Sequence, residues 1–112
     1  MPSIKAVAKP ALSLEQKLGQ KLMLDFRYFC EQGTGQHCRT PMTKLPESLA
    51  RVISDYNIGG VILFSENTQS IEQTITLSHQ LQVAASKSLS KLPLFISIDQ
   101  EGGRVARLPR DV

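Results

Sequence analysis

Three short, almost unbroken apolar runs constrain the fold of this chain more than any other feature. They are KLMLDF at residues 21–26, IGGVILF at 58–64 and LFISID at 94–99. Apolar runs without polar alternation are typical of strands that are buried on both faces, as in parallel sheets. A segment with helical signals precedes each run, so the order α-β-α-β-α-β predicts an α/β fold with a parallel sheet and right-handed crossovers.

Capping signals and apolar spacing predict the three helices. An S-x-x-Q capping box at 13–16 opens a short first helix, and a second box at 70–73 opens a longer third one. Between them, a helix led by a proline is expected over 46–57. The third helix should end near Lys87 and bury one face, formed by Ile71, Ile75, Ser78, Leu81 and Ala85.

Length and composition set further bounds on the class of protein. The 112 residues suffice for one domain, expected over residues 13–112 after a flexible arm at 1–12, whereas a complete (β/α)₈ barrel needs about 250 residues. Hydrophobic residues make up 41%, but no run reaches the roughly 18 apolar residues of a membrane span. The net charge of +3 is scattered and the chain has no Trp, so nucleic-acid binding is not expected.

The two cysteines leave the compartment open. Cys30 and Cys38 flank a glycine-rich segment, and their spacing suits a small disulfide loop but lacks the paired C-x-x-C units of a zinc site. Residues 1–11 have no apolar core of a secretory signal, which favours a cytoplasmic protein with two free thiols. In a periplasmic or exported protein the same residues would form a disulfide. No metal site is predicted.

Candidate chemistry lies where the strands of a parallel sheet end. Asp25, the segment 65–67 and the segment 99–104 occupy these places. Asp99 closes the third strand, two glycines follow, and Arg107 comes shortly after. A carboxylate accepts from hydroxyls and a guanidinium donates to them, so the pair suits a polyhydroxylated ligand. An ion pair that merely ties down the loop explains the spacing equally well.

Other signals are weaker. Asp99 and Glu101 could approach the separation of about 5–5.5 Å found in retaining glycosidases, but a D-x-E spacing is common by chance. Gly59-Gly60 precedes a strand, so close packing explains it better than phosphate binding. His79 is expected on a helix surface, and no nucleophile with a well-placed base stands out.

The run IDQEGGRVARL at 98–108 resembles the N-terminal signature of glycoside hydrolase family 3, in its β-N-acetylhexosaminidase branch. The similarity extends upstream. LSLEQKLGQKLMLDF (12–26) resembles the family's first helix and strand, YNIGGVILFSENTQSIEQ (56–73) its second strand and the next helix, and PLFISIDQEGGRV (93–105) its third strand and sugar-binding loop. The segment around the cysteines is not covered, and it departs from compact cytoplasmic members, which leaves an exported enzyme open.

The resemblance implies the first three β/α units of a TIM-type (β/α)₈ barrel. It implies hydrolysis of terminal β-linked N-acetylglucosamine from peptidoglycan fragments or chitin oligosaccharides, with retention and without a cofactor or metal. By the family pattern Asp99 binds hydroxyls of the amino sugar and Arg107 helps to hold it. The family's catalytic residues are expected beyond Val112, so this chain, an N-terminal fragment with the rest of the barrel missing, should be inactive alone.

Two alternatives remain at this stage. The chain could be a standalone α/β module that binds a sugar or an anion without turnover. It could also belong to a family 3 β-glucosidase, although the turn Gln100-Glu101-Gly102-Gly103 disfavours this reading because glucosidase members usually carry a different turn.

Overall fold

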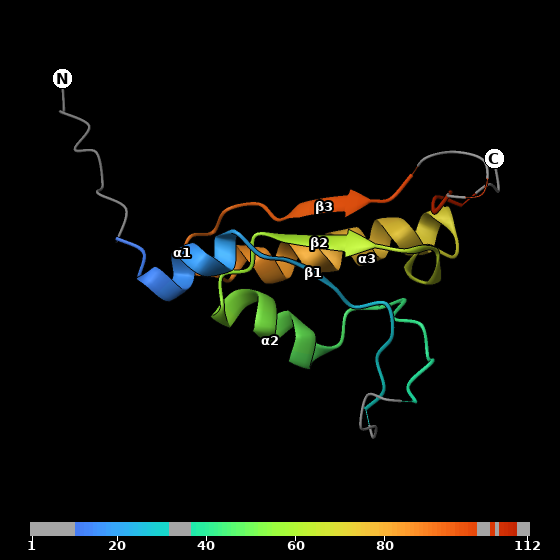
Figure 1. The fold of residues 1–112 in the computed structure, drawn as a ribbon, viewed down its shortest axis with the longest axis horizontal. Helices are drawn as coiled ribbons and strands as arrows, with labels where there is room; N and C mark the ends of the chain where they lie inside the picture. Colours follow the sequence, from blue (N-terminus) through green and yellow to red (C-terminus); the bar gives the residue numbers. More distant parts are fainter. Residues whose placement is uncertain (1–10, 32–36, 101–103, 105, 110–112) are drawn as a thin grey trace.

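The computed structural model describes residues 11–31, 37–100, 104 and 106–109. It confirms the predicted α/β order, with three parallel strands arranged β1-β2-β3 (Figure 1). The elements are α1 (Leu14–Gln20), β1 (Met23–Asp25), α2 (Glu47–Asp55), β2 (Gly60–Leu63), the 3₁₀ turn η1 (Ser65–Asn67), α3 (Ile71–Ser86) and β3 (Phe95–Ile98). Each strand is shorter than the apolar run that contains it.

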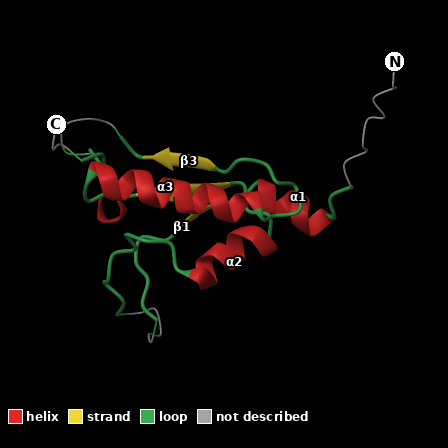
Figure 2. Ribbon diagram, turned by 180° about the vertical axis from the view of Figure 1, so that it is seen from behind, coloured by secondary structure: helices red, strands yellow, loops and turns green. Residues whose placement is uncertain are grey.

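Two helices cover one face of the sheet. Figure 2 shows α3 lying lengthwise over the strands, with α2 beside it. The core between these layers is formed by Ile53 of α2, Leu77 and Leu81 of α3, and Val61 and Leu63 of β2, all 0–3% exposed. β2 is therefore the central, most deeply buried strand, as its continuous apolar run predicts.

Every second residue of each strand points its side chain to the opposite face of the sheet. The register pairs Met23 with Gly60 and Gly60 with Phe95, and one layer further Asp25 with Ile62 and Ile62 with Ser97. Phe95 is 77% exposed. Among the described residues no element covers this face, which is the face that a closed barrel turns toward its interior.

The capping predictions are largely correct at the helix starts. Ser13 and Gln16 form the complete capping box, with the Gln16 backbone N–H donating to Ser13 Oγ (3.2 Å) and the Ser13 N–H to Gln16 Oε1 (2.8 Å). The second box is only half formed. Ser70 Oγ accepts from the Gln73 N–H at 3.1 Å, but Gln73 Oε1 accepts from the Gln69 N–H because the amide is also bonded to neighbouring loop carbonyls. Pro46 is the N-cap of α2, so the helix begins at Glu47, one residue after the predicted start.

The predicted buried face of α3 is partly wrong. Ile71 and Ile75 are 38% and 64% exposed, whereas Leu77, Leu81, Ala84 and Ala85 are buried. Successive helical residues are about 100° apart, so Ile75 and Leu77 lie on nearly opposite sides and cannot both face the sheet. Leu77 does, since it continues the stripe that reaches Leu81 and Ala84.

The amino edge of the sheet is closed by tight backbone packing. Asn57 ends α2 as predicted, with a φ of 55°, and its side chain is 1% exposed. Its Nδ2 donates to the Gln16 carbonyl at 3.1 Å, and Ser90 Oγ donates to its Oδ1 at 2.5 Å. A Cβ on Gly59 would lie 2.0 Å from the Gln20 carbonyl oxygen, which confirms the predicted close packing. None of the helices described is long and apolar enough to cross a membrane.

Candidate functional site

The carboxyl edge of the sheet gathers polar side chains from all three strand ends. In Figure 1 the arrowheads of β2 and β3 point toward this edge. The residues that follow the strands and interact here are Arg27, Tyr28, Phe64, Glu66, Asn67, Asp99 and Arg107.

The two predicted site residues lie together at this edge. Arg107 Nη2 is 4.0 Å from Asp99 Oδ2, and the side chains are 25% and 44% exposed. Arg107 Nε is buried and has no hydrogen-bond partner among the described residues. Ion pairs of this length and exposure contribute about 0–1 kcal/mol, so the pair is a weak tie for the loop. Of the other predicted residues, Arg104 is exposed and Glu101, Gly102 and Gly103 lie outside the described residues.

A second arginine, Arg27, lies over the ring of Phe64, and the sequence analysis did not identify it. The Arg27 guanidinium is 3.8 Å from the centroid of the Phe64 ring, and the Arg107 guanidinium is 5.9 Å from it. The Phe64 ring therefore lies near two cations, which follow the two outer strands β1 and β3. Cation–π contacts of this kind contribute about 0.5–2 kcal/mol each. The one signal that could have found Arg27 was its position directly after the first strand.

Glu66 balances Arg27. Its Oε2 is 3.8 Å from Arg27 Nε, and the Tyr28 hydroxyl donates to its Oε1 at 3.3 Å. A hydrogen bond from its own backbone, the charge of Arg27 and hydrogen bonds from Tyr28 and Ser65 lower the pKa of Glu66, while burial opposes the shift. The carboxylate is therefore ionised at neutral pH. The segment 65–67 was correctly placed at this edge.

Asn67 stabilises the carboxyl edge of the sheet through buried hydrogen bonds. It is fully buried, and its Nδ2 lies 2.8 Å from the Met42 carbonyl and 3.2 Å from the Phe26 carbonyl. Its Oδ1 accepts from the Phe64 N–H at 3.0 Å. The side chain thus joins the exit of β1, the exit of β2 and the returning loop, and it positions the backbone from which Phe64 and Arg27 project.

The expectation of two free thiols is wrong, because Cys30 and Cys38 form a disulfide with Cα atoms 5.9 Å apart. The physical reason lies next to them in the loop. Tyr28 and Pro41 form an antiparallel bridge, and the Phe29 N–H donates to the Thr40 carbonyl at 3.0 Å. These contacts bring the two arms of the loop side by side, so the cysteines face each other and Cys30 has no thiol to act as a nucleophile.

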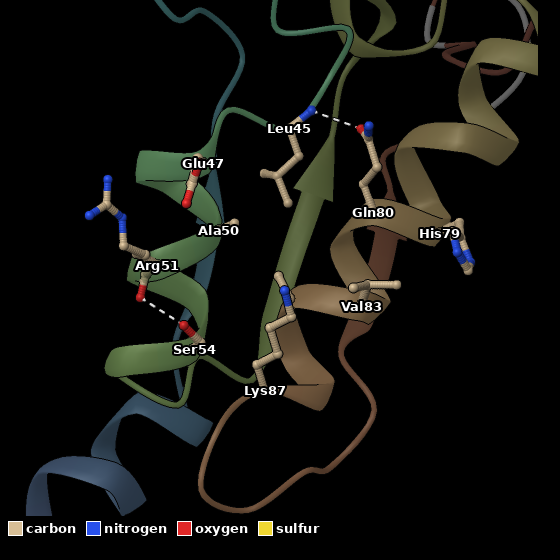
Figure 3. A pocket seen from close by; sticks show the side chains of 10 residues that line it. Leu45, Glu47, Ala50, Arg51, Ser54, His79, Gln80, Val83 and Lys87 are labelled. Carbon is tan, nitrogen blue, oxygen red and sulfur yellow. Dashed lines mark hydrogen bonds between the residues drawn. The ribbon is translucent and has the colours of Figure 1, made fainter.

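The remaining candidates do not join the cluster. Asp25 is exposed, and its Oδ1 accepts from the Arg27 N–H at 3.4 Å. His79 lines an open hollow of about 480 Å³ between α2 and α3, where it and Arg51 point away from each other (Figure 3). Within the part of the chain that the structure describes, no three His, Cys, Asp or Glu side chains are grouped as metal ligands.

The comparison with protein families decides the family. Residues 13–111 match the family described as the glycosyl hydrolase family 3 N terminal domain. The chain belongs to this family. The family match agrees with the fold: the three parallel strands and their helices correspond to the first β/α units of a TIM-type barrel.

Relatives and a solved structure agree with this assignment. The chain is 56% identical over 106 residues to the beta-hexosaminidase A of Pseudoalteromonas piscicida, and 33% identical to an uncharacterized secreted glycosyl hydrolase of Arthroderma benhamiae. Each similarity covers 93% of this chain, but 18% and 26% of the relative. A glycoside hydrolase family 3 beta-N-acetylglucosaminidase from Paenibacillus sp. str. FPU-7 superimposes on 91% of this chain, and on 16% of its own, with a TM-score of 0.69 and 35% identity. The chain thus spans about a fifth of the length of these family members.

Proposed function

We propose that this chain forms part of a β-N-acetylhexosaminidase, an enzyme that removes terminal β-linked N-acetylglucosamine with retention of configuration. The observation that carries the proposal is the pairing of Asp99 with Arg107 at the carboxyl edge of a parallel sheet, in a chain of this family. Support comes from the 56% identical relative, whose name is a beta-hexosaminidase, and from the superimposed beta-N-acetylglucosaminidase.

The proposed role of this chain is to bind and orient the sugar. The Asp99 carboxylate accepts hydrogen bonds from sugar hydroxyls, and the Arg107 guanidinium donates to sugar oxygens. At 4.0 Å the two groups are loosely paired, so each retains capacity for a ligand. A retaining glycosidase also needs a nucleophile and an acid/base. We assign neither role to a described residue, and we place both in the remainder of the enzyme.

The test uses the full-length protein that carries this sequence, with an aryl β-N-acetylglucosaminide and the matching aryl β-glucoside. We expect hydrolysis of the amino sugar, with the β-anomer released first when the reaction is followed by NMR. Preferred hydrolysis of the glucoside would contradict the substrate assignment, and release of the α-anomer would contradict retention. The isolated 112-residue chain should hydrolyse neither substrate.

We also propose that the enzyme acts outside the cytoplasm. The disulfide between Cys30 and Cys38 favours an oxidising compartment. Mass spectrometry of protein taken directly from its native cells, with free thiols blocked at lysis, should find the two cysteines linked. Quantitative labelling of both thiols would instead return the protein to the cytoplasm.

A further inference from the structure

The backbone of Arg107 is held at both of its polar groups by side chains. Its N–H donates to Gln100 Oε1 at 2.6 Å, and its carbonyl oxygen accepts from Thr68 Oγ1. The same Gln100 oxygen also accepts from the Leu108 N–H at 3.2 Å. A peptide unit bonded on both sides in this way has little freedom to rotate.

The two holding side chains come from different strand ends. Gln100 follows β3, on the chain segment that carries Asp99, whereas Thr68 follows η1 beyond the end of β2. Thr68 is 4% exposed and lies beside the buried Asn67, so its hydroxyl has a fixed position. The backbone of Arg107 is therefore bonded both to the segment that follows β2 and to the segment that follows β3.

The side chain of Arg107 has weaker supports. Its ion pair with Asp99 measures 4.0 Å, and its guanidinium is 5.9 Å from the Phe64 ring centroid. No helix or strand contains it. An arginine side chain loses up to about 2 kcal/mol of rotamer entropy when it is ordered. A fixed backbone reduces the number of conformers that the free side chain can adopt, so less entropy is lost when the sugar binds.

We propose that Gln100 and Thr68 are positioning residues, which hold Arg107 for the sugar by bonding its backbone from two sides. The inference rests on the proposed function, because it assumes that Arg107 contacts the substrate. Neither side chain needs to touch the sugar for this role. The inference predicts that their removal weakens substrate binding through Arg107.

The variants are chosen in matched pairs. Thr68→Val keeps the shape but removes the hydroxyl, and Thr68→Ser retains it. Gln100→Met keeps the length but removes the acceptor, and Gln100→Glu retains it. In the full-length enzyme we expect Thr68→Val and Gln100→Met to raise KM about 3- to 10-fold, the size of one neutral hydrogen bond, with kcat changed less. Thr68→Ser and Gln100→Glu should stay closer to the unchanged enzyme.

A double-mutant cycle separates positioning from general structural support. In an Arg107→Ala background, Thr68→Val and Gln100→Met should have no further effect on KM, because the group they position is gone. If each raises KM by the same factor with and without the Arg107 side chain, the inference is overturned. Thermal melts of every variant identify any loss of folded protein.

Hydrogen exchange tests the holding contacts without any reliance on activity. In the full-length protein, Gln100→Met should increase exchange of the peptide that contains the Arg107 and Leu108 amides, and Gln100→Glu should not. Unchanged exchange in Gln100→Met would refute the proposal that Gln100 holds the Arg107 backbone. If the exchange result is as expected but the wild-type protein hydrolyses no β-N-acetylglucosaminide, the proposed function fails and the positioning role for the sugar fails with it. The hydrogen bonds that hold the Arg107 backbone would still be supported.

Discussion

The two ends of the sheet are each built around a buried asparagine, yet they differ in charge. Asn57 at the amino edge is 1% exposed and Asn67 at the carboxyl edge is fully buried. Each bonds segments that are far apart in the sequence: Asn57 bonds Gln16 and Ser90, and Asn67 bonds the exits of β1 and β2. Both ends therefore use one buried amide side chain, with its polar atoms hydrogen-bonded, to link segments that are far apart in the sequence.

Charge distinguishes the carboxyl edge. Both ion pairs formed by the described residues lie there, Arg27 with Glu66 and Arg107 with Asp99, and all four side chains keep some exposure. The amino edge is instead closed by glycines against backbone carbonyls. A buried amide alone thus indicates scaffolding, whereas half-exposed charges are the feature that distinguishes the edge of the proposed sugar site.

The largest expected effect breaks the amino edge. In Gly59→Ala the new Cβ would meet the Gln20 carbonyl oxygen at 2.0 Å, and backbone cannot give way as a side chain can. We expect a loss of about 3 kcal/mol or more in the free energy of unfolding, or failure to fold. The matched control is Gly60→Ala, whose nearest contact is the flexible Met23 Cε at 2.9 Å, and it should cost about 1 kcal/mol. Equal losses in urea unfolding would contradict the packing argument.

Removal of either asparagine tests whether the two scaffolds are equivalent. Asn57→Ala removes a partner of the Gln16 carbonyl and of the Ser90 hydroxyl. Asn67→Ala removes a partner of the Phe64 N–H and of the Met42 carbonyl, and each group left without a partner costs about 1–3 kcal/mol. We expect losses of about 2–4 kcal/mol in unfolding free energy for both. Asn57→Gly should lose less than Asn57→Ala, because glycine adopts the φ of 55° without strain. An unfolding energy unchanged in either alanine variant would show that its amide network is not structural.

Asp99→Asn changes the carboxyl edge in charge alone. Hydrogen bonds to charged groups contribute about 1.5–3 kcal/mol, so kcat/KM of the full-length enzyme should fall about 10- to 100-fold. Its unfolding energy should change little, because Asp99 is half-exposed and weakly paired. Asp55→Asn, an exposed aspartate at the end of α2, is the matched control and should leave kcat/KM unchanged. Full activity in Asp99→Asn would make Asp99 an ion-pair residue only.

The smallest effect concerns the pH dependence of Glu66. Its pKa is lowered in the folded state, so its ionised form stabilises the fold above the pKa of the unfolded chain, and this contribution is lost as pH falls through the lowered pKa. Glu66→Gln should therefore lose less than about 1 kcal/mol at pH 7 relative to wild type, and the difference should shrink in acid. Thermal melts of both proteins across pH measure this difference. A constant difference would contradict the lowered pKa of Glu66.

Local signals in the sequence were sufficient for most of the fold. Capping residues marked the starts of α1 and α3, and unbroken apolar runs marked β1, β2 and β3, because these depend on neighbours in the chain. The buried face of α3 was misjudged because Ile75 and Leu77 are both apolar and only tertiary packing selects between them. Whether the two cysteines are free or disulfide-bonded depends on pairing between the arms of the loop, and no residue type in the sequence predicts that pairing.

The candidate site was predictable only in part for the same reason. Asp99 and Arg107 lie eight residues apart in one motif, so the sequence alone brings them together. Arg27, Phe64 and Glu66 meet only because the parallel register aligns the ends of β1 and β2, and contacts between residues nearly forty positions apart leave no local pattern.

The central claim is that the carboxyl edge of this sheet holds an amino sugar. A crystal structure of the full-length protein with N-acetylglucosamine bound tests it most directly. The account predicts that sugar hydroxyls lie within about 3.2 Å of the Asp99 carboxylate. It also predicts that the Arg107 guanidinium points toward the same sugar ring. A sugar bound at another place, with Asp99 and Arg107 still paired only with each other, would contradict it.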